Sequence, residues 1–183
     1  MNLADTAPVV VRAAADADLP AIASLYAHHV LCGTASFEVA APTVDDMRRR
    51  HRDVCARGLP YFVASLADGG AGLAGYAYAT EYRSRVAYRH TVEDSVYVDP
   101  ACVRRGAGRA LLAAVIGACE ALGYRQMIAV IGDSGNAASI SLHAALGFRH
   151  AGVLSAVGRK FDRWIDTVLM QRALGPGDST AAS

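Results

Sequence analysis

The spacing of hydrophobic and polar positions changes several times along the chain, between periods typical of strands and of helices. Short apolar or alternating runs rich in Val, Ile, Tyr and Phe predict strands at 9–12, 61–66, 73–82, 91–98, 126–131, 148–157 and 164–172. Apolar positions three and four residues apart predict helices at 16–31, 44–56, 108–122 and 136–147. A strand, a helix and a second strand in the middle of this order favour a mixed α/β or α+β domain with a parallel pair.

Residues at the boundaries support these elements. Asp18-Leu19-Pro20 is a helix start in which proline fits the first turn, and Thr43 is a candidate N-cap for the second helix. Asp99-Pro100 ends the strand before the third helix, and Gly123 follows that helix. Asp68-Gly69-Gly70 predicts a tight turn between two neighbouring strands.

The composition is typical of a single compact domain and does not favour a nucleic-acid-binding protein. The chain has 183 residues, of which 53% are hydrophobic and 19% charged, which is typical of one compact domain. We place that domain at 8–174, with a flexible N-terminus at 1–7 and a disordered tail at 175–183. The formal net charge of +1 provides no field that would favour nucleic acid, and the basic run 48–52 is interpreted as the solvated face of a helix.

The sequence lacks the patterns typical of membrane-spanning, secreted and metal-binding proteins. No apolar run approaches the roughly 20 residues that cross a bilayer, and no signal-peptide pattern is present. Cys32, Cys55, Cys102 and Cys119 form no CxxC pair and no metal-like cluster. We therefore expect a cytoplasmic protein with reduced thiols, no bound metal and no membrane partner.

A basic glycine loop opens the third helix and carries the first chemical signal. Gly106 and Gly108 flank Ala107, and Arg104, Arg105 and Arg109 surround them. Unpaired N–H groups at a helix N-terminus, together with guanidinium groups, suit the oxygens of a diphosphate. A dinucleotide fingerprint would need a glycine in place of Leu111, and a P-loop would need Gly-Lys-Ser/Thr. The alternative is a helix that begins with glycines among solvated arginines.

The predicted helix after the fifth strand adds a second signal. Asn136, Ser139 and His143 lie three, four and seven positions apart and therefore share one helical face. A diphosphate loop, a strand, and then N-x-x-S-x-x-x-H-x-x-x-G-F resemble the GCN5-related N-acetyltransferases (GNAT). That family writes its loop Q/R-x-x-G-x-G/A, and this chain departs from it at Val103.

The resemblance extends to one group within that family. Thr34-Ala-Ser-Phe-Glu38, the run E-D-S-V-Y-V from Glu93, Ile128 to Gly132, and Val157 to Phe161 with Trp164-Ile-Asp166 resemble the phosphinothricin acetyltransferases. That group also contains the methionine sulfone and sulfoximine acetyltransferases. The likeness covers roughly residues 8–174. It implies a mixed, mostly antiparallel central sheet flanked by helices, with central parallel strands that splay apart.

The resemblance also implies acetyl-CoA as cosubstrate and assigns residues to it. The loop would grip the pyrophosphate, the splayed strand would bind the pantetheine arm, and the Asn136 helix would bind that arm and the cofactor periphery. The residues so implied are Val96, Tyr97, Val98, Arg104, Arg105, Gly106, Ala107, Gly108, Arg109, Asn136 and Ser139. A backbone N–H at a bulge near 96–98 would bind the oxyanion formed at the thioester. Without a bulge, strand parity places Glu93, Ser95 and Tyr97 on one face.

Two catalytic roles follow from the same resemblance. Glu93 would be the general base that deprotonates the acceptor amine, directly or through a water. His143 stands where the phosphinothricin group has a histidine, and it would be a second proton-transfer group paired with Glu93 around the amine. The alternatives are a glutamate at the exposed mouth of a strand and a capped or buried imidazole.

The implied acceptor is the α-amine of a small amino-acid analogue. Arg83 or Arg85 could hold its carboxylate, and Phe37 and Tyr88 could form an aromatic wall, with Val86 and Ala87 beside them. Lys160 and Phe161 are weaker candidates, and His28, His29 and His90 are interpreted as structural or surface residues. The family also implies a homodimer. The competing hypotheses are acetylation of another amine (a protein N-terminus, a polyamine or an aminoglycoside) and a non-catalytic acyl-CoA-binding module.

Overall fold

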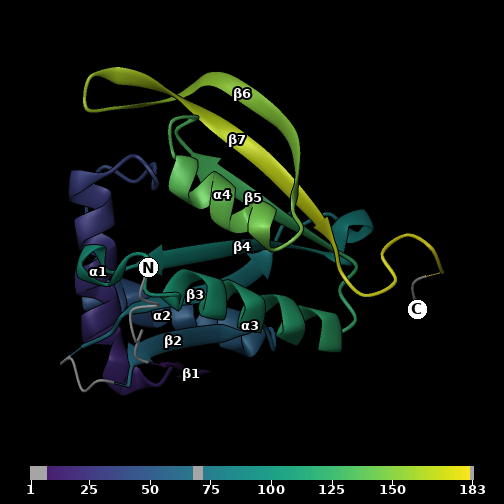
Figure 1. The fold of residues 1–183 in the computed structure, drawn as a ribbon, viewed down its shortest axis with the longest axis horizontal. Coiled ribbons are helices and arrows are strands. Elements are labelled where there is room, and N and C mark those ends of the chain that lie inside the picture. Colours follow the sequence, from purple (N-terminus) through teal and green to yellow (C-terminus); the bar gives the residue numbers. More distant parts are fainter. Residues whose placement is uncertain (1–7, 68–71, 182–183) are drawn as a thin grey trace, which may run out of the picture.

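The computed structural model describes residues 8–67 and 72–181, which form one sheet with helices on both faces (Figure 1). Its strands are β1 (Val9–Ala13), β2 (Tyr61–Leu66), β3 (Gly75–Glu81), β4 (Thr91–Val98), β5 (Gln126–Gly132), β6 (Arg149–Lys160) and β7 (Arg163–Ala173). Its helices are α1 (Leu19–Cys32), α2 (Val44–Ala56), α3 (Ala107–Ala121) and α4 (Ala137–Ala145). The strands lie in the order β1-β2-β3-β4-β5-β7-β6, so the predicted mixed α/β class is confirmed.

The two faces of the sheet have different cores. On one face, tyrosines from β2, β3 and β4 stack on one another, with ring centroids 4.8 Å apart for Tyr61 and Tyr78 and 5.1 Å for Tyr76 and Tyr97. α1 and α2 cover this face, where Tyr26 and His51 meet the tyrosine rings edge-on. The other face packs against α3 (Figure 1), where Leu111, Leu112 and Val115 are fully buried. Residues next to each other on β4 therefore face different helices.

The centre of the sheet splits. β4 and β5 run parallel and pair from Thr91↔Gln126 to Asp94↔Ala129, although both strands continue beyond that point. β4 stays in register with β3 along its whole length, and β5 stays in register with β7. Because each strand follows its outer neighbour and sheets twist, the two halves part after Asp94. The splay is thus confirmed, but the predicted bulge at 96–98 is wrong, since the β3–β4 register runs without a shift.

Most predicted elements differ from the observed ones by one or two residues at their ends. α2 spans the predicted 44–56, and the Thr43 hydroxyl accepts a hydrogen bond from the Asp46 N–H at 3.1 Å, as a capping residue should. The predicted connector at 83–89 contains a 3₁₀ turn, Val86–Tyr88. The turn predicted at 68–70, the flexible 1–7 segment and residues 182–183 lie outside the described residues. In the predicted tail the chain forms turns at 175–178, and Arg125 donates to the Thr180 hydroxyl at 2.9 Å.

The basic run on α2 is engaged with neighbouring acids. Arg48 and Arg49 pair with acids one turn earlier on the helix, and Arg50 donates to Glu38 at 2.7 Å. His51 is buried against the tyrosine core instead of being solvated. None of the helices in 8–67 and 72–181 has the length and apolar character needed to cross a bilayer.

Candidate active site

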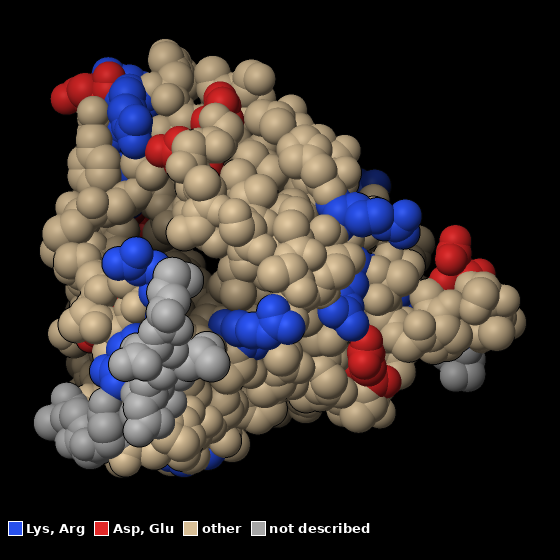
Figure 2. Space-filling view, in the orientation of Figure 1, with Lys and Arg blue, Asp and Glu red and all other residues tan. Residues whose placement is uncertain are grey.

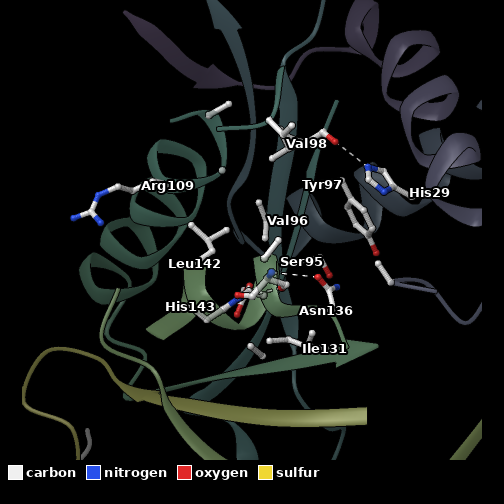
Figure 3. Close-up of a pocket in the computed structure, with 18 of the residues that line it drawn as sticks. His29, Ser95, Val96, Tyr97, Val98, Arg109, Ile131, Asn136, Leu142 and His143 are labelled. Carbon is white, nitrogen blue, oxygen red and sulfur yellow. Dashed lines mark hydrogen bonds and ion pairs between the residues drawn. The ribbon is translucent and has the colours of Figure 1, made fainter. Parts of the chain in front are cut away.

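A cleft of about 680 Å³ lies where β4 and β5 part, between the start of α3 and the side of α4 (Figure 3). It is lined by most of the residues predicted to bind the cosubstrate, namely Val96, Tyr97, Val98, Arg104, Gly106, Ala107, Gly108, Arg109, Asn136 and Ser139, together with His143. Arg105 is not among the lining residues. Three elements that are distant in sequence therefore contribute to one cavity, the arrangement that the family resemblance implied.

The glycine loop forms one end of the cleft. Gly106 caps α3 with a φ of +88°, a left-handed conformation that residues with a side chain rarely adopt. A Cβ on Gly108 would lie 3.2 Å from side-chain atoms of both Leu142 and Val98, so a larger residue would crowd the cleft. Arg104 and Arg109 line the same end, and Figure 2 shows Lys and Arg side chains on both sides of a hollow in this face. Helix N–H groups and guanidinium groups thus converge where a diphosphate would fit.

α4 forms the wall opposite β4. Asn136 caps this helix, because its side-chain oxygen accepts a hydrogen bond from the Ser139 N–H at 3.2 Å. Asn136, Leu142 and His143 reach from α4 toward β4 (Figure 3). The shared helical face predicted for Asn136, Ser139 and His143 is present, because all three line the cleft.

His143 does not pair with Glu93. Its Nε2 lies 3.0 Å from Oδ2 of Asp94, and its Nδ1 lies 2.7 Å from the Ser139 carbonyl oxygen, so both ring nitrogens are engaged. Consecutive strand residues point to opposite faces, and Asp94 faces α4 while Glu93 faces the tyrosine side. The sequence did not indicate Asp94 as a site residue. The alternation of side chains along a strand could have shown that Asp94 and Glu93 face opposite sides of the sheet.

Glu93 is half-buried at the point where the β4–β5 ladder is about to end. It lies opposite Thr80 of β3 and next to Ile128 of β5. Burial, and then the negative charge of Asp94, raise the pKa of Glu93 to about 7. A carboxyl group poised near neutral pH is suited to accept and release a proton during a reaction.

The predicted acceptor residues are split between two places. Arg83, Arg85 and Tyr88 line a separate cavity of about 400 Å³ with Ser84, and the Arg83 guanidinium lies over the Tyr88 ring at 5.7 Å. Val86 and Ala87 belong to the 3₁₀ turn beside it. Phe37 lies elsewhere, with its ring packed on the backbone of Gly158 in β6 so closely that a Cβ there would lie 2.2 Å from the ring.

Two residues have clearer positions than the sequence indicated. Lys160 is buried and donates to the carbonyl oxygens of Gly33 and Ser36 at 2.8 and 2.7 Å, so it fastens the Thr34–Glu38 loop to the β6–β7 hairpin. His29 lines the cleft, and its Nε2 donates to the Val98 carbonyl oxygen at 3.0 Å. Burial lowers the pKa of His29, so its ring is neutral at physiological pH.

Known proteins with similar sequences and structures identify the family of this chain. A protein-family model described as an acetyltransferase (GNAT) domain matches residues 11–169. The chain belongs to the GNAT acetyltransferase family. Phosphinothricin N-acetyltransferase of Alcaligenes faecalis is 58% identical over 170 residues, covering 93% of this chain and 85% of that protein. L-methionine sulfoximine/L-methionine sulfone acetyltransferase of Pseudomonas aeruginosa is 41% identical, covering 91% and 95% of the two chains.

The solved structures place this GNAT acetyltransferase in the same group. The phosphinothricin acetyltransferase of Sinorhizobium meliloti, solved in complex with AcCoA, superimposes with a TM-score of 0.91 at 44% identity. The match covers 96% of this chain and 93% of that one. The predicted family, its phosphinothricin and methionine sulfoximine branch, and the splayed-sheet fold are therefore confirmed. The chain is an N-acetyltransferase.

The Lys160 contacts lead to a stability prediction for this acetyltransferase. Lys160→Met should lower the free energy of unfolding by about 2 kcal/mol or more, because two buried carbonyl oxygens lose a charged donor. Urea denaturation monitored by circular dichroism measures the loss. Arg159→Met is the matched control, because the exposed ion pair of Arg159 with Asp162 should contribute little. Equal losses in both variants would contradict the role assigned to Lys160.

Proposed function

We propose that this chain transfers the acetyl group of acetyl-CoA to the α-amine of a small amino-acid analogue of the phosphinothricin, methionine sulfone or methionine sulfoximine class. One observation carries the proposal: Glu93, with its pKa near 7, lies where the splayed strands open, in a chain 58% identical to a phosphinothricin N-acetyltransferase. We infer that residues 8–174 form a single domain for this reaction. The free thiols of the four cysteines support a cytoplasmic location.

The cleft fits the chemistry of acetyl-CoA. Acetyl-CoA supplies an acetyl thioester, which a neutral amine converts into an amide and a free thiol. The start of α3, with Gly106, Arg104 and Arg109, provides donors for the pyrophosphate. The β5-facing edge of β4 beyond Asp94 has left the ladder, so its backbone groups at 96–98 can pair with an extended amide-containing arm. Arg105 is included among the proposed acetyl-CoA-binding residues because it lies between Arg104 and Gly106 in the glycine loop.

Glu93 provides the base that the reaction needs. An α-amine with a pKa of roughly 7.7–8.0 or above is mostly protonated at neutral pH and cannot attack until it loses that proton. The Glu93 carboxylate takes the proton, directly or through a water, and with a pKa of about 7 roughly half of it is ionised at pH 7 and most of it at pH 8.

The acceptor side is proposed from the two groups of residues that the family resemblance implied, the turn before β4 and the Thr34–Glu38 loop. Arg83 and Arg85, in the cavity next to the start of β4, can hold an acceptor carboxylate, with Tyr88 as an aromatic wall. Phe37, which is 41% exposed, is the candidate from the loop that Lys160 fastens.

Thiol release from acetyl-CoA tests the proposal. The acceptors are phosphinothricin, methionine sulfone, methionine sulfoximine, a peptide, a polyamine and an aminoglycoside, each at the same concentration. Release with the amino-acid analogues alone supports the proposed acceptor class. Release with only a peptide, polyamine or aminoglycoside would assign a different amine, and tight acetyl-CoA binding without release would favour the non-catalytic module.

The β6–β7 hairpin supports the proposed homodimer. It forms one edge of the sheet (Figure 1) and exposes Val153, Leu154, Val157, Phe161 and Trp164, the last with 67% of its surface exposed. Apolar side chains gathered on one element are typical of an interface between proteins, and a second copy of this chain is the partner that the family implies.

We expect Trp164→Glu to convert the dimer into a monomer, because a carboxylate buried in the interface would lose its hydration. Size-exclusion chromatography with light scattering measures the change in mass. Leu122→Glu is the control, since Leu122 is 53% exposed at the end of α3 and lies outside the hairpin. A dimer that persists in Trp164→Glu would place the interface elsewhere.

A further inference from the structure

A buried carboxylate–imidazole pair lies directly behind Glu93. Asp94 and His143 are 6% and 2% exposed, and Oδ2 of Asp94 lies 3.0 Å from Nε2 of His143. Oδ1 of Asp94 is buried without a hydrogen-bond partner among the described residues. The buried negative charge of Asp94 is therefore compensated by His143. Asp94 also lines the cleft.

The hydrogen bonds of His143 determine where its protons are. Nδ1 lies 2.7 Å from the Ser139 carbonyl oxygen, which can only accept, so Nδ1 must carry a hydrogen. A second proton must then lie between Nε2 and the Asp94 carboxylate, because two lone pairs 3.0 Å apart would repel each other. Burial alone would lower the pKa of His143, but its hydrogen bonds and the charge of Asp94 outweigh burial and raise the pKa.

We propose that Asp94 and His143 form a buried imidazolium–carboxylate pair whose carboxylate sets the charge beside Glu93. Asp94 is then a positioning residue for the general base, and His143 neither gives a proton to the acceptor nor takes one from it. The inference rests on the proposed function in that Glu93 is the base. It replaces the proton-transfer role that the family resemblance implied for His143.

The titratable side chains beside Glu93 and beside Asp94 on neighbouring elements stay neutral near physiological pH. Tyr78 of β3 is close enough to Glu93 for their charges to interact, and burial raises the pKa of its hydroxyl. Cys119 of α3 interacts with Asp94, and burial, followed by the charge of Asp94, raises the pKa of its thiol to about 12. Between α4 and β6, the apolar ring of Phe148 lies edge-on to His143, with the ring centroids 5.0 Å apart. β5 carries no titratable side chain between 126 and 132.

Two near-isosteric variants separate the roles. In Asp94→Asn the new amide can donate to a neutral Nε2 while Nδ1 keeps its bond to Ser139. The variant loses the negative charge that raises the pKa of Glu93, and His143 becomes neutral with it, so the acidic limb of the kcat/KM profile should move lower by up to about one pH unit. In His143→Gln the new amide can still donate to Asp94, but the compensating positive charge is gone. The acidic limb should then stay in place or move higher, with plateau kcat within about tenfold of the unaltered enzyme.

The experiment is a pH profile of acceptor acetylation for the unaltered chain and both variants, with nitrogen NMR of the His143 ring in each protein that retains it. We expect both ring nitrogens to be protonated at pH 7 in the unaltered chain and Nδ1 alone in Asp94→Asn. A neutral His143 in the unaltered chain would overturn the proposal. So would a plateau kcat about 100-fold lower in His143→Gln, or an unmoved acidic limb in Asp94→Asn.

Failure of this inference can be distinguished from failure of the proposed function. If no amino-acid analogue is acetylated, the proposed function fails, whereas the NMR signature still reports on the charged pair. If acetylation occurs with a neutral His143, the function stands and the inference fails. Thermal melting of both variants shows whether each is folded, and His143→Asn serves as a second, shorter amide if His143→Gln does not fold.

Discussion

Glu93→Gln is expected to lower kcat/KM for the acceptor by about 10²–10⁴-fold, the range that a positioned general base contributes. The amide has the same shape but cannot take a proton from the ammonium group. Binding of acetyl-CoA should be unchanged, because Glu93 is not among the residues that line the cleft. Thiol release at pH 8 measures the first quantity, and isothermal titration calorimetry with acetyl-CoA measures the second.

Glu81→Gln is the matched control for this substitution. Glu81 lies on the neighbouring strand β3, is exposed, and forms an ion pair with Arg57 at 3.6 Å. Its loss should leave kcat/KM within about twofold, as expected for an exposed ion pair. A loss smaller than about fivefold in Glu93→Gln would mean that another group, or water, removes the proton.

The second large effect concerns pH. The Glu93 carboxylate is the active form, and the pKa of Glu93 is raised from 4.5 to about 7, so the base is lost as pH falls through 7 and not through 4.5. Below pH 7, kcat/KM should therefore fall about tenfold for each pH unit, reaching about 1% of its plateau at pH 5. Initial rates between pH 5 and 9 measure the profile.

The acceptor amine also titrates, so the assignment to Glu93 needs its own control. Two acceptors whose amine pKa values differ should share the limb that belongs to Glu93 and differ in any limb that belongs to the amine. An acidic limb near 4.5, or one that follows the acceptor, would contradict the raised pKa of Glu93.

The sequence predicted local structure well where a local cause decides it. Thr43 capped the helix 44–56 as expected, because a cap needs only its own side chain and the following turn. The glycines at 106 and 108 marked the start of α3 and one end of the cleft, because backbone conformation and lack of a Cβ are properties of single residues. The order of elements indicated the parallel central pair, and the family resemblance then supplied Glu93 and the splay of that pair.

Predictions that depended on distant partners were less successful. The bulge at 96–98 was wrong, because the continuous β3–β4 register, and not β4 by itself, decides whether a residue is inserted. His143 was matched with Glu93 instead of Asp94, since helical spacing shows which residues share a face but not which strand residue that face meets. Lys160 gave no local signal for its two carbonyl partners more than 120 residues earlier.

By itself, the sequence determined the elements and the glycine-marked start of α3, since periodicity, capping and glycine positions act over a few residues, and its combined motifs identified the family. Only the tertiary structure decided that β4 and β5 part after Asp94, that Glu93 and Asp94 face opposite sides of the sheet, and that His143 compensates a buried carboxylate. These features depend on contacts between segments about 35–50 positions apart. Their energies come from burial and charge, which local sequence patterns do not contain.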